Sequence, residues 1–314
     1  MAEIVTLSAR VPREAYGGGE PKFMAKLQRA EPAIIDSSAA QTFKKCARQY
    51  FYRYVLGRKT KKEPEFFRFG RSYHKFREVL ERTQDFKEAL VAAQTLFRKG
   101  GGDPVVGSKY DFMTELRLLK SCTVAWEHWK KEKTLKVIEV IAIEQPFNVE
   151  LADGSRTSGR ADQVVKWNGK LWGRDFKTSS KMGKFYERSL EPNDQFSRYT
   201  FSEGKLAGEP VQGQIVEVLY NTKKDGPSLH QFLATRTLSQ LAVWESEQMF
   251  YNLILNTCRE TDTWPMNENA CWNCDYHSVC KTPTEVMMMN RLENDYIYSP
   301  WDNMKVDQID EGEE

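Results

Sequence analysis

One stretch, residues 158–180 (SGRADQVVKWNGKLWGRDFKTSS), restricts the fold of this chain more than any other. It predicts two short β-strands joined at Asn168-Gly169, a dipeptide that favours a tight hairpin turn. The first strand carries Asp162, and the second carries Asp175 and Lys177. We therefore expect an antiparallel hairpin that brings two carboxylates and one lysine close together.

The charges on this hairpin allow two interpretations. Side chains alternate across a strand, so Asp175 and Lys177 share one face while Phe176 lies on the other. Together with Asp162, they can hold a divalent cation and orient a water beside it. The alternative is a surface hairpin with solvated charges, because Asp-x-Lys is too common a pattern to decide the matter alone.

Length and composition describe a globular protein. The chain has 314 residues, of which 40% are hydrophobic and 29% charged, which is enough for one large domain or two small ones. The sequence contains no run of about 18 apolar residues, so it predicts no membrane span. The N-terminus lacks an apolar signal core, so we expect a cytoplasmic protein. Six cysteines in such a chain favour a metal site over a disulfide framework. The sequence contains no phosphate-binding loop and so no built-in nucleotide motor.

Charge is unevenly distributed although the formal net charge is only +2. Residues 37–62 contain eight basic residues and no acidic one, whereas residues 281–314 contain nine acidic and three basic residues. A basic early segment predicts contact with a polyanion. The acidic tail, residues 282–314, is expected to be disordered. Residues 1–33, with three consecutive glycines, are expected to form an N-terminal arm.

The basic segment coincides with a predicted helix from about Asp36 to Leu56, ended by Gly57. Its aromatic rings alternate with basic side chains, which would suit stacked bases and paired phosphates. The alternative is that most of these rings belong to the core. The basic residues chosen as DNA contacts are Lys44, Arg53, Arg58 and Lys59.

The remaining pattern predicts a mixed α/β protein. Helices are expected at 66–83, 84–99, 109–133, 193–204 and 238–260, and strands at 137–151, at the hairpin, at 214–220 and at 229–237. This order places a mixed sheet between helical segments. We expect a single domain at 34–281, composed of a helical part (34–134), a catalytic sheet core (135–237), and a long helix with a cysteine cluster (238–281).

Three cysteines near the C-terminus form a compact group. Cys271-x2-Cys274 is followed five residues later by Cys280, which is one thiolate short of a complete set for zinc or an iron–sulfur cubane. The residues left open as the fourth ligand are Cys46, Cys122, Cys258 and His277. If the fourth ligand is Cys46, the site ties the first helix to the C-terminal segment.

Several motifs resemble the RecB-type nucleases of the PD-(D/E)xK superfamily, in the branch that carries an iron–sulfur cluster. That branch includes the AddB nuclease domain and small CRISPR-associated exonucleases, and stand-alone copies occur in phages. The motifs follow the family's order and span about residues 36–281. They are Gly70-Arg-Ser-Tyr-His74, Glu144 ahead of Pro146-Phe147, Gly159-Arg-Ala-Asp162, Asp175-Phe-Lys177-Thr178, Gln195-x3-Tyr199, and Cys46 with the three C-terminal cysteines.

The resemblance implies a PD-(D/E)xK core and assigns roles to its residues. It implies that Asp162, Asp175, His74 and the backbone carbonyl of Phe176 hold Mg²⁺ or Mn²⁺, and that Lys177 activates the water. The carboxylate of Glu144 would lie in the second shell or join a second metal.

Two further expectations concern the helix after the hairpin and the cysteines. Gln195 and Tyr199 lie one helical turn apart, and they would brace the lysine or touch the DNA backbone. The resemblance also implies that Cys46, Cys271, Cys274 and Cys280 bind a [4Fe–4S] cluster.

The expected function is that of a metal-dependent DNA exonuclease acting on single strands or duplex ends. Such an enzyme would serve recombination, repair or phage DNA processing, with DNA as its substrate and recombination proteins as the expected protein partners. The alternative, from another class, is a non-catalytic DNA-binding or assembly factor of a recombination or CRISPR-adaptation complex. The intact Asp162, Asp175 and Lys177 favour the enzyme. A third alternative is an interaction protein stabilised by zinc.

Overall fold

A five-stranded mixed sheet forms the centre of the protein. The structure, a computed structural model, describes residues 35–181 and 183–301. The strands follow the spatial order β2-β3-β4-β5-β6. They are β2 (Ile138–Glu150), β3 (Arg156–Trp167), β4 (Lys170–Ser179), β5 (Val211–Tyr220) and β6 (Ser228–Thr235). The expected α/β fold with a mixed central sheet is confirmed.

One parallel pair determines where a site can form. The pairs β2–β3, β3–β4 and β5–β6 are antiparallel, whereas β4 and β5 run parallel, with Ser179 opposite Tyr220. The connection between them contains α6 (Lys184–Arg188) and α7 (Asp194–Ala207). The carboxyl ends of β4 and β5 therefore meet at one edge of the sheet, the edge at which open α/β sheets commonly bind ligands.

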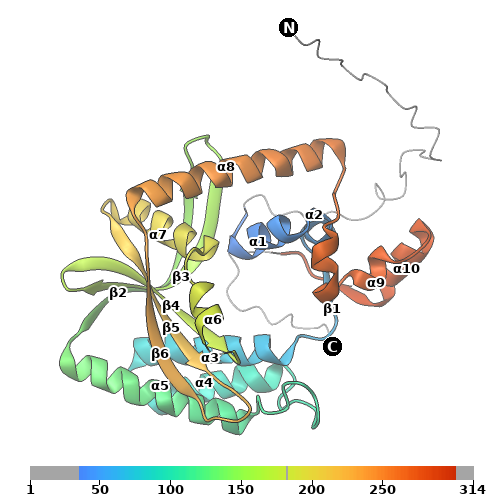
Figure 1. Ribbon diagram of the computed structural model, residues 1–314. Helices are drawn as coiled ribbons and strands as arrows, with labels where there is room; N and C mark the ends of the chain where they lie inside the picture. Colours follow the sequence, from blue (N-terminus) through green and yellow to red (C-terminus); the bar gives the residue numbers. More distant parts are fainter. Residues whose placement is uncertain (1–34, 182, 302–314) are drawn as a thin grey trace.

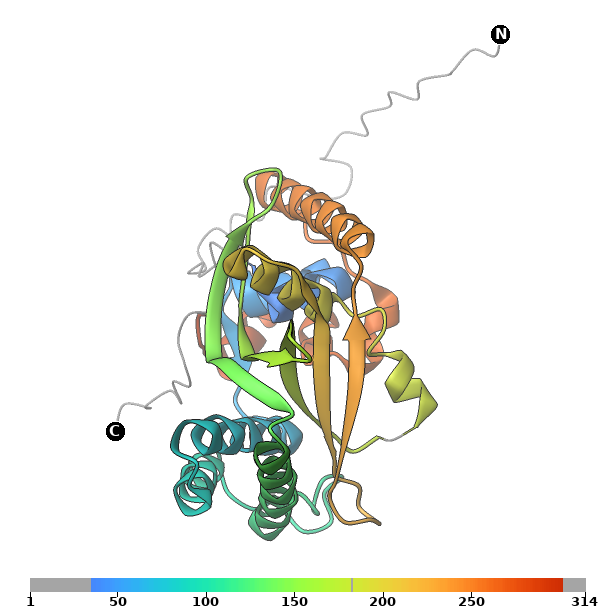
Figure 2. The same cartoon turned by 90° about the vertical axis from the view of Figure 1, so that its left-hand side faces the viewer.

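Helices cover both faces of this sheet (Figures 1 and 2). On one side lie α3 (Glu65–Thr83), α4 (Phe86–Lys99) and α5 (Glu115–Leu135), and on the other lie α7 and α8 (Leu238–Thr261). Phe176 and Leu219 pack into the first layer, while the alternating Val216 and Val218 pack on the second, as a strand with two covered faces requires. Among the described residues, no helix is both long enough and apolar enough to cross a membrane.

A second core joins the first and last described segments of the chain. α1 (Ser37–Lys45), α2 (Ala47–Tyr50) and the π-helical turn η3 (Phe51–Val55) pack against α9 (His277–Cys280), α10 (Glu285–Asn294) and the loop before them. Figure 1 shows this body beside the sheet. Tyr50, Phe51, Tyr52 and Tyr54 are at most 4% exposed, so these rings belong to the core and do not stack bases.

The expected disorder of the acidic tail is wrong for its first half. Residues of α10 and β7 (Tyr296–Tyr298) are ordered, and β7 pairs antiparallel with β1 (Arg58–Thr60). Met289, Leu292 and Tyr296 are buried in the second core, so apolar side chains between the acidic ones hold the segment in place. The remaining tail residues, 302–314, and the expected arm lie outside the described residues.

The predicted helix from Asp36 to Leu56 is interrupted. Asp36 caps it as expected, accepting a hydrogen bond from the Ala39 backbone N–H at 2.8 Å. At Cys46, however, the backbone is extended, with φ −165° and ψ 113°. The break leaves backbone N–H groups without partners in the helix, and the segment before η4 (Glu268–Asn273) supplies one. The Arg48 N–H donates to the Pro265 carbonyl at 3.1 Å.

Candidate functional site

The central hairpin brings Asp162 to the strand that carries Asp175. Asn168 and Gly169 both have positive φ, as the predicted hairpin turn requires. The β3–β4 ladder ends at the pair Gln163–Arg174. Just beyond that point, the Asp162 carboxylate accepts the backbone N–H of Phe176 at 2.7 Å. The carboxylate thus bridges the strands where their own pairing stops.

Helix α3 brings a histidine to this point. A Cβ on Gly70 would lie 3.0 Å from Thr178 Oγ1, so glycine lets α3 approach the end of β4 closely. One turn later, His74 Nδ1 lies 3.4 Å from Asp162 Oδ2. Burial, the largest single influence, would lower the pKa of His74, but the charge and hydrogen bond of Asp162 together with the charge of Asp175 outweigh it and raise the pKa above its ordinary value.

Asp175 lies at the centre of the polar contacts from β4 and α7. Its carboxylate is 2.8 Å from Lys177 Nζ, and it accepts a hydrogen bond from Gln195 Nε2 at 3.2 Å. The same Gln195 nitrogen donates to the Tyr199 hydroxyl at 3.0 Å. Gln195 therefore braces the aspartate and not, as one expectation had it, the lysine. The Phe176 ring points to the opposite face, into the core.

The two aspartates have different proton affinities. Burial would raise the pKa of Asp162, but His74 and Lys177 outweigh burial and hold this pKa below its ordinary value. At Asp175 burial dominates and, despite Lys177, raises the pKa to about 6. Pairs of carboxyl groups whose pKa values are pushed apart are typical of reactive sites.

Two glutamates enlarge the acidic group. Glu144 lies in β2 with a φ of +51°, a backbone conformation that costs free energy in a non-glycine residue and is enriched at functional sites. Burial, together with the charges of Asp162 and Glu78, raises the pKa of Glu144 to about 7. Glu78 was not predicted from the sequence, although its position four residues after His74 on one helix face was an available signal. Arg160 lies 3.6 Å from Glu144 and partly offsets the charge.

These side chains line a cleft of about 1030 Å³ that extends to the second core. His74, Glu78, Glu144, Asp162 and Lys177 lie along it. It continues past basic side chains on α1, η3, β1 and α3, namely Lys45, Arg53, Lys59, Arg71 and Lys75.

Two of the four predicted DNA contacts lie elsewhere or have other partners. Lys44 Nζ pairs with Asp194 at 2.7 Å and does not line the cleft. The Arg58 guanidinium lies 5.7 Å from the centre of the Tyr298 ring, in the β1–β7 pair. Arg53 and Lys59 do line the cleft, and Arg53 also donates to the Ser299 carbonyl at 3.0 Å.

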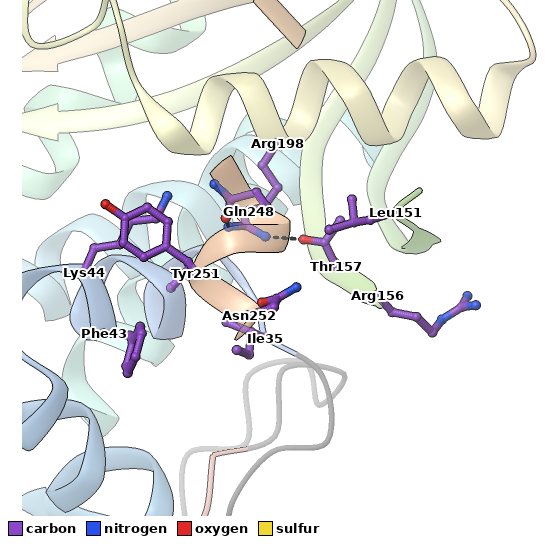
Figure 3. A pocket seen from close by; sticks show the side chains of 11 residues that line it. Ile35, Phe43, Lys44, Leu151, Arg156, Thr157, Arg198, Gln248, Tyr251 and Asn252 are labelled. Carbon is purple, nitrogen blue, oxygen red and sulfur yellow. Dashed lines mark hydrogen bonds between the residues drawn. The ribbon is translucent and has the colours of Figure 1, made fainter. Parts of the chain in front are cut away.

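Lys44 belongs to a structural network around a cavity of about 10 Å³, room for roughly one water. Figure 3 shows Arg198 from α7 directed toward Thr157 of β3 beside Gln248 of α8. Arg198 donates to the Thr157 hydroxyl and, at 2.8 Å, to Gln248 Oε1. This network fastens α1 to the nearby strand and helices, which explains why a lysine of the basic segment is directed away from the cleft.

A second acidic group lies where helix α5 meets strand β5. Ligand atoms of His128, Glu132 and Glu217 lie within 4.8 Å of one another, so the group could in principle hold a cation. Arg174 Nη2, however, lies 2.9 Å from Glu132 and also pairs with Glu217, and Arg77 pairs with Glu217 at 3.2 Å. Two buried guanidinium groups already neutralise these carboxylates, so we interpret the group as an ion-pair network.

The cysteines expected to bind a cluster come from both ends of the second core. The Cys46 sulfur accepts the backbone N–H of Asn267 at 3.4 Å, which brings it beside the segment that carries the other three. Burial raises the pKa of Cys280, and so do the nearby thiols of Cys274 and Cys46. Within the described residues, the four sulfur atoms, including that of Cys271, do not all lie within 4.8 Å of one another.

The comparison with protein families identifies the superfamily of the chain. The model of the PD-(D/E)XK nuclease superfamily matches residues 37–281, more than half of the chain. The chain belongs to the PD-(D/E)XK nuclease superfamily. Members of this superfamily use divalent metals, so this nuclease needs carboxylates of the kind that the hairpin supplies. The AddB-type iron–sulfur branch is a finer assignment that the match does not make.

The other comparisons add little to this assignment. The nuclease is similar to a "putative exonuclease" of Eubacterium rectale, with 13% identity, a TM-score of 0.49, and coverage of 92% of this chain and 98% of that one. A second similar structure, SSO0001, has 13% identity and a TM-score of 0.30 over 67% of this chain and 83% of that one. No match was found among curated proteins.

Proposed function

We propose that this PD-(D/E)XK nuclease is a divalent-metal-dependent deoxyribonuclease, and most specifically an exonuclease on single-stranded DNA or duplex ends. The observation that carries the proposal is the convergence of His74, Asp162 and Lys177 at a cleft with basic walls, with the buried Asp175 paired to Lys177. A module that only binds DNA needs the basic walls but has no use for a buried Asp175 beside a lysine.

The donor set fits Mg²⁺ or Mn²⁺. Asp162 and Asp175 offer carboxylate oxygens, the carbonyl of Phe176 lies on the strand between Asp175 and Lys177, and His74 adds a nitrogen that Mn²⁺ accepts more readily than Mg²⁺ does. Asp175 is 1% exposed, and a buried carboxylate with a raised pKa gains stabilisation from a cation beside it. When bound, such a cation would neutralise phosphate charge and acidify a water.

Each remaining side chain has a definable task. The ammonium group of Lys177 reaches the open cleft, where it can orient the attacking water and offset charge that develops on the phosphate. Gln195 and Tyr199 hold Asp175 in one orientation. Glu144, whose pKa burial and the neighbouring carboxylates raise to about 7 in the metal-free protein, would lie beside the first metal or join a second one.

The cleft also fits the substrate. Arg53 and Lys59 line it at the end away from the hairpin, and Arg71 and Lys75 line it on the helix that carries His74. A row of cations leading to an acidic centre can hold a phosphate backbone and present one phosphate to the metal.

We further propose that Cys46, Cys271, Cys274 and Cys280 hold a [4Fe–4S] cluster that fastens the two segments of the second core. The support is the donor chemistry and the position of Cys46 beside Asn267. A cubane is wider than a single ion, so its ligands stand farther apart than the sulfurs of a zinc site. The proposed role is structural, as for a metal that couples folding to binding.

A digest of end-labelled DNA tests the catalytic proposal. Single-stranded and blunt duplex oligonucleotides are incubated with Mg²⁺, with Mn²⁺ or with chelator, and products are resolved by length. We expect stepwise shortening from an end with either cation and none with chelator. Intact substrate in every metal condition, combined with DNA binding, would favour the non-catalytic assembly factor.

A further inference from the structure

A smaller cavity of about 190 Å³ opens beside the catalytic cleft. It lies at the carboxyl ends of β4 and β5, between the first turn of α3 and the segment that precedes α5. Its walls include Phe66, Tyr110, Thr178, Lys181 and Asn221. Typical sites for drug-sized ligands start at roughly 300 Å³, so this cavity is suited to a smaller group.

One wall of the cavity is aromatic and open to solvent. Phe66 is 38% exposed and its neighbour Phe67 is 59% exposed, with ring centres 4.4 Å apart. The Phe66 ring also lies 5.3 Å from that of Tyr110. A partly exposed ring that neighbouring rings hold in place offers a flat face on which a planar ligand can stack.

Another residue that lines the cavity carries an amide without hydrogen-bond partners. Asn221 is 1% exposed, and neither its Oδ1 nor its Nδ2 has a hydrogen-bond partner in the described part of the chain. Its backbone N–H donates to the Ser179 carbonyl at 2.8 Å, which fixes its position at the end of β5. A buried carboxamide without hydrogen-bond partners costs free energy. A ligand that carries both a donor and an acceptor on one edge would remove this cost by pairing with both amide atoms.

The cavity adjoins the catalytic residues. Phe66 and Thr178 line both the cavity and the cleft, and Thr178 directly follows Lys177 on β4. A group that enters the cavity therefore lies beside the cleft into which Lys177 reaches. Exposed Lys181 lines the cavity, where an ammonium group can meet a neighbouring phosphate.

We propose that this cavity is a subsite for one unpaired nucleobase, the base next to the phosphate that is cleaved. The base would stack on Phe66 and form hydrogen bonds through its edge with the Asn221 amide, which offers both donors and an acceptor. A base inside a duplex cannot enter, because its edge is paired and both its faces are stacked. This inference rests on the proposed function and narrows its substrate to single-stranded or frayed DNA.

Binding of abasic oligonucleotides tests the subsite. Lys177→Ala protein, which should not cleave, is titrated with a labelled single strand in which one abasic residue is moved stepwise from the end, in Mg²⁺. We expect one position at which loss of the base weakens binding about ten-fold. In Phe66→Ala and Asn221→Leu versions of this protein the intact strand should bind more weakly, and the abasic residue should no longer matter there.

The matched control is Phe250→Ala, because Phe250 is as exposed as Phe67 but lies on α8 and does not line either cavity. It should bind like the parent. If Asn221→Leu does not fold, Phe66→Ala alone still decides the matter, since its ring is partly exposed.

Separate outcomes distinguish the two proposals. A protein that cleaves DNA but tolerates abasic residues equally at every position overturns the subsite and leaves the nuclease standing. Base-dependent binding without any cleavage by the wild type supports the subsite and overturns the catalytic proposal. Equal weakening of intact and abasic strands by Phe66→Ala also overturns the subsite, because it shows that the ring acts without a base.

Discussion

Replacing Asp175 by asparagine should stabilise the metal-free protein at neutral pH while abolishing its activity. The aspartate is 1% exposed, and burial raises its pKa from 3.8 to about 6. The difference, 6 − 3.8 = 2.2, corresponds to roughly 3 kcal/mol of unfolding free energy that the ionised carboxylate costs the fold at pH 7. Asparagine keeps the oxygen that accepts from Gln195 but carries no charge. Since Lys177 loses its partner, we expect a net gain of about 1–3 kcal/mol.

The pH dependence gives the sign of the effect. A carboxyl group with a raised pKa binds its proton more tightly in the folded state, so its contribution favours folding below pH 3.8. That contribution is lost as pH rises from 3.8 to about 6. The advantage of Asp175→Asn should therefore be absent below pH 3.8, grow up to about pH 6 and stay constant above it. Urea unfolding in the presence of chelator, followed by circular dichroism at several pH values, measures it.

Asp194→Asn is the matched control because it should have the opposite sign. Burial would raise the pKa of Asp194, but Arg198 and Lys44 outweigh burial and lower it, so the ionised form stabilises the fold. This variant should be less stable than the parent at pH 7, and the deficit should shrink as pH falls below 3.8. If Asp175→Asn is destabilised at pH 7 by an amount that does not change with pH, the carboxylate is not strained and the reasoning fails.

Three further predictions concern cleavage, DNA binding and the cluster. Lys177→Ala should lower the cleavage rate about 100-fold or more in Mg²⁺ while leaving circular dichroism unchanged, and near-parental cleavage would remove the lysine from the mechanism. Charge reversal at both Arg53 and Lys59 should flatten the plot of log affinity against log salt by roughly one to two units, and an unchanged slope would place the DNA elsewhere. Cys46→Ala should lose its iron. It should also lose about 4 kcal/mol of stability, because the long loop between Cys46 and Cys271 is no longer closed by the cluster. Cys122→Ala should keep its iron. A fully loaded Cys46→Ala, measured by iron and sulfide analysis, would refute the ligand assignment.

Local pattern predicted the central hairpin well because every signal in it is short-range. The Asn168-Gly169 turn and the alternation around Phe176 depend on neighbours within a few residues. The face shared by Gln195 and Tyr199 follows from helix geometry in the same way. The structure brings these residues together much as the pattern indicated.

The sequence was less informative where distant segments decide the conformation. The break at Cys46 is stabilised by hydrogen bonds to residues more than 200 positions later, so the local helical pattern could not reveal it. β7 was missed because three residues carry too little periodicity. Asn221 follows a buried strand and looks like an ordinary turn residue; only its burial without partners singles it out.

The pairing of β1 with β7 has a consequence for how the protein is made. Arg58 and its partner Tyr298 are 240 residues apart in sequence (298 − 58). At typical synthesis rates a ribosome needs about 10 to 50 s to cover that distance. Until then the strand that borders the basic cleft has an unpaired edge, and unpaired edges invite association with other chains. Because β1 is only three residues long, few unpaired backbone groups are exposed during that time. The wall of the cleft near β1 is therefore completed only once most of the chain has been translated, well after the central hairpin has left the ribosome.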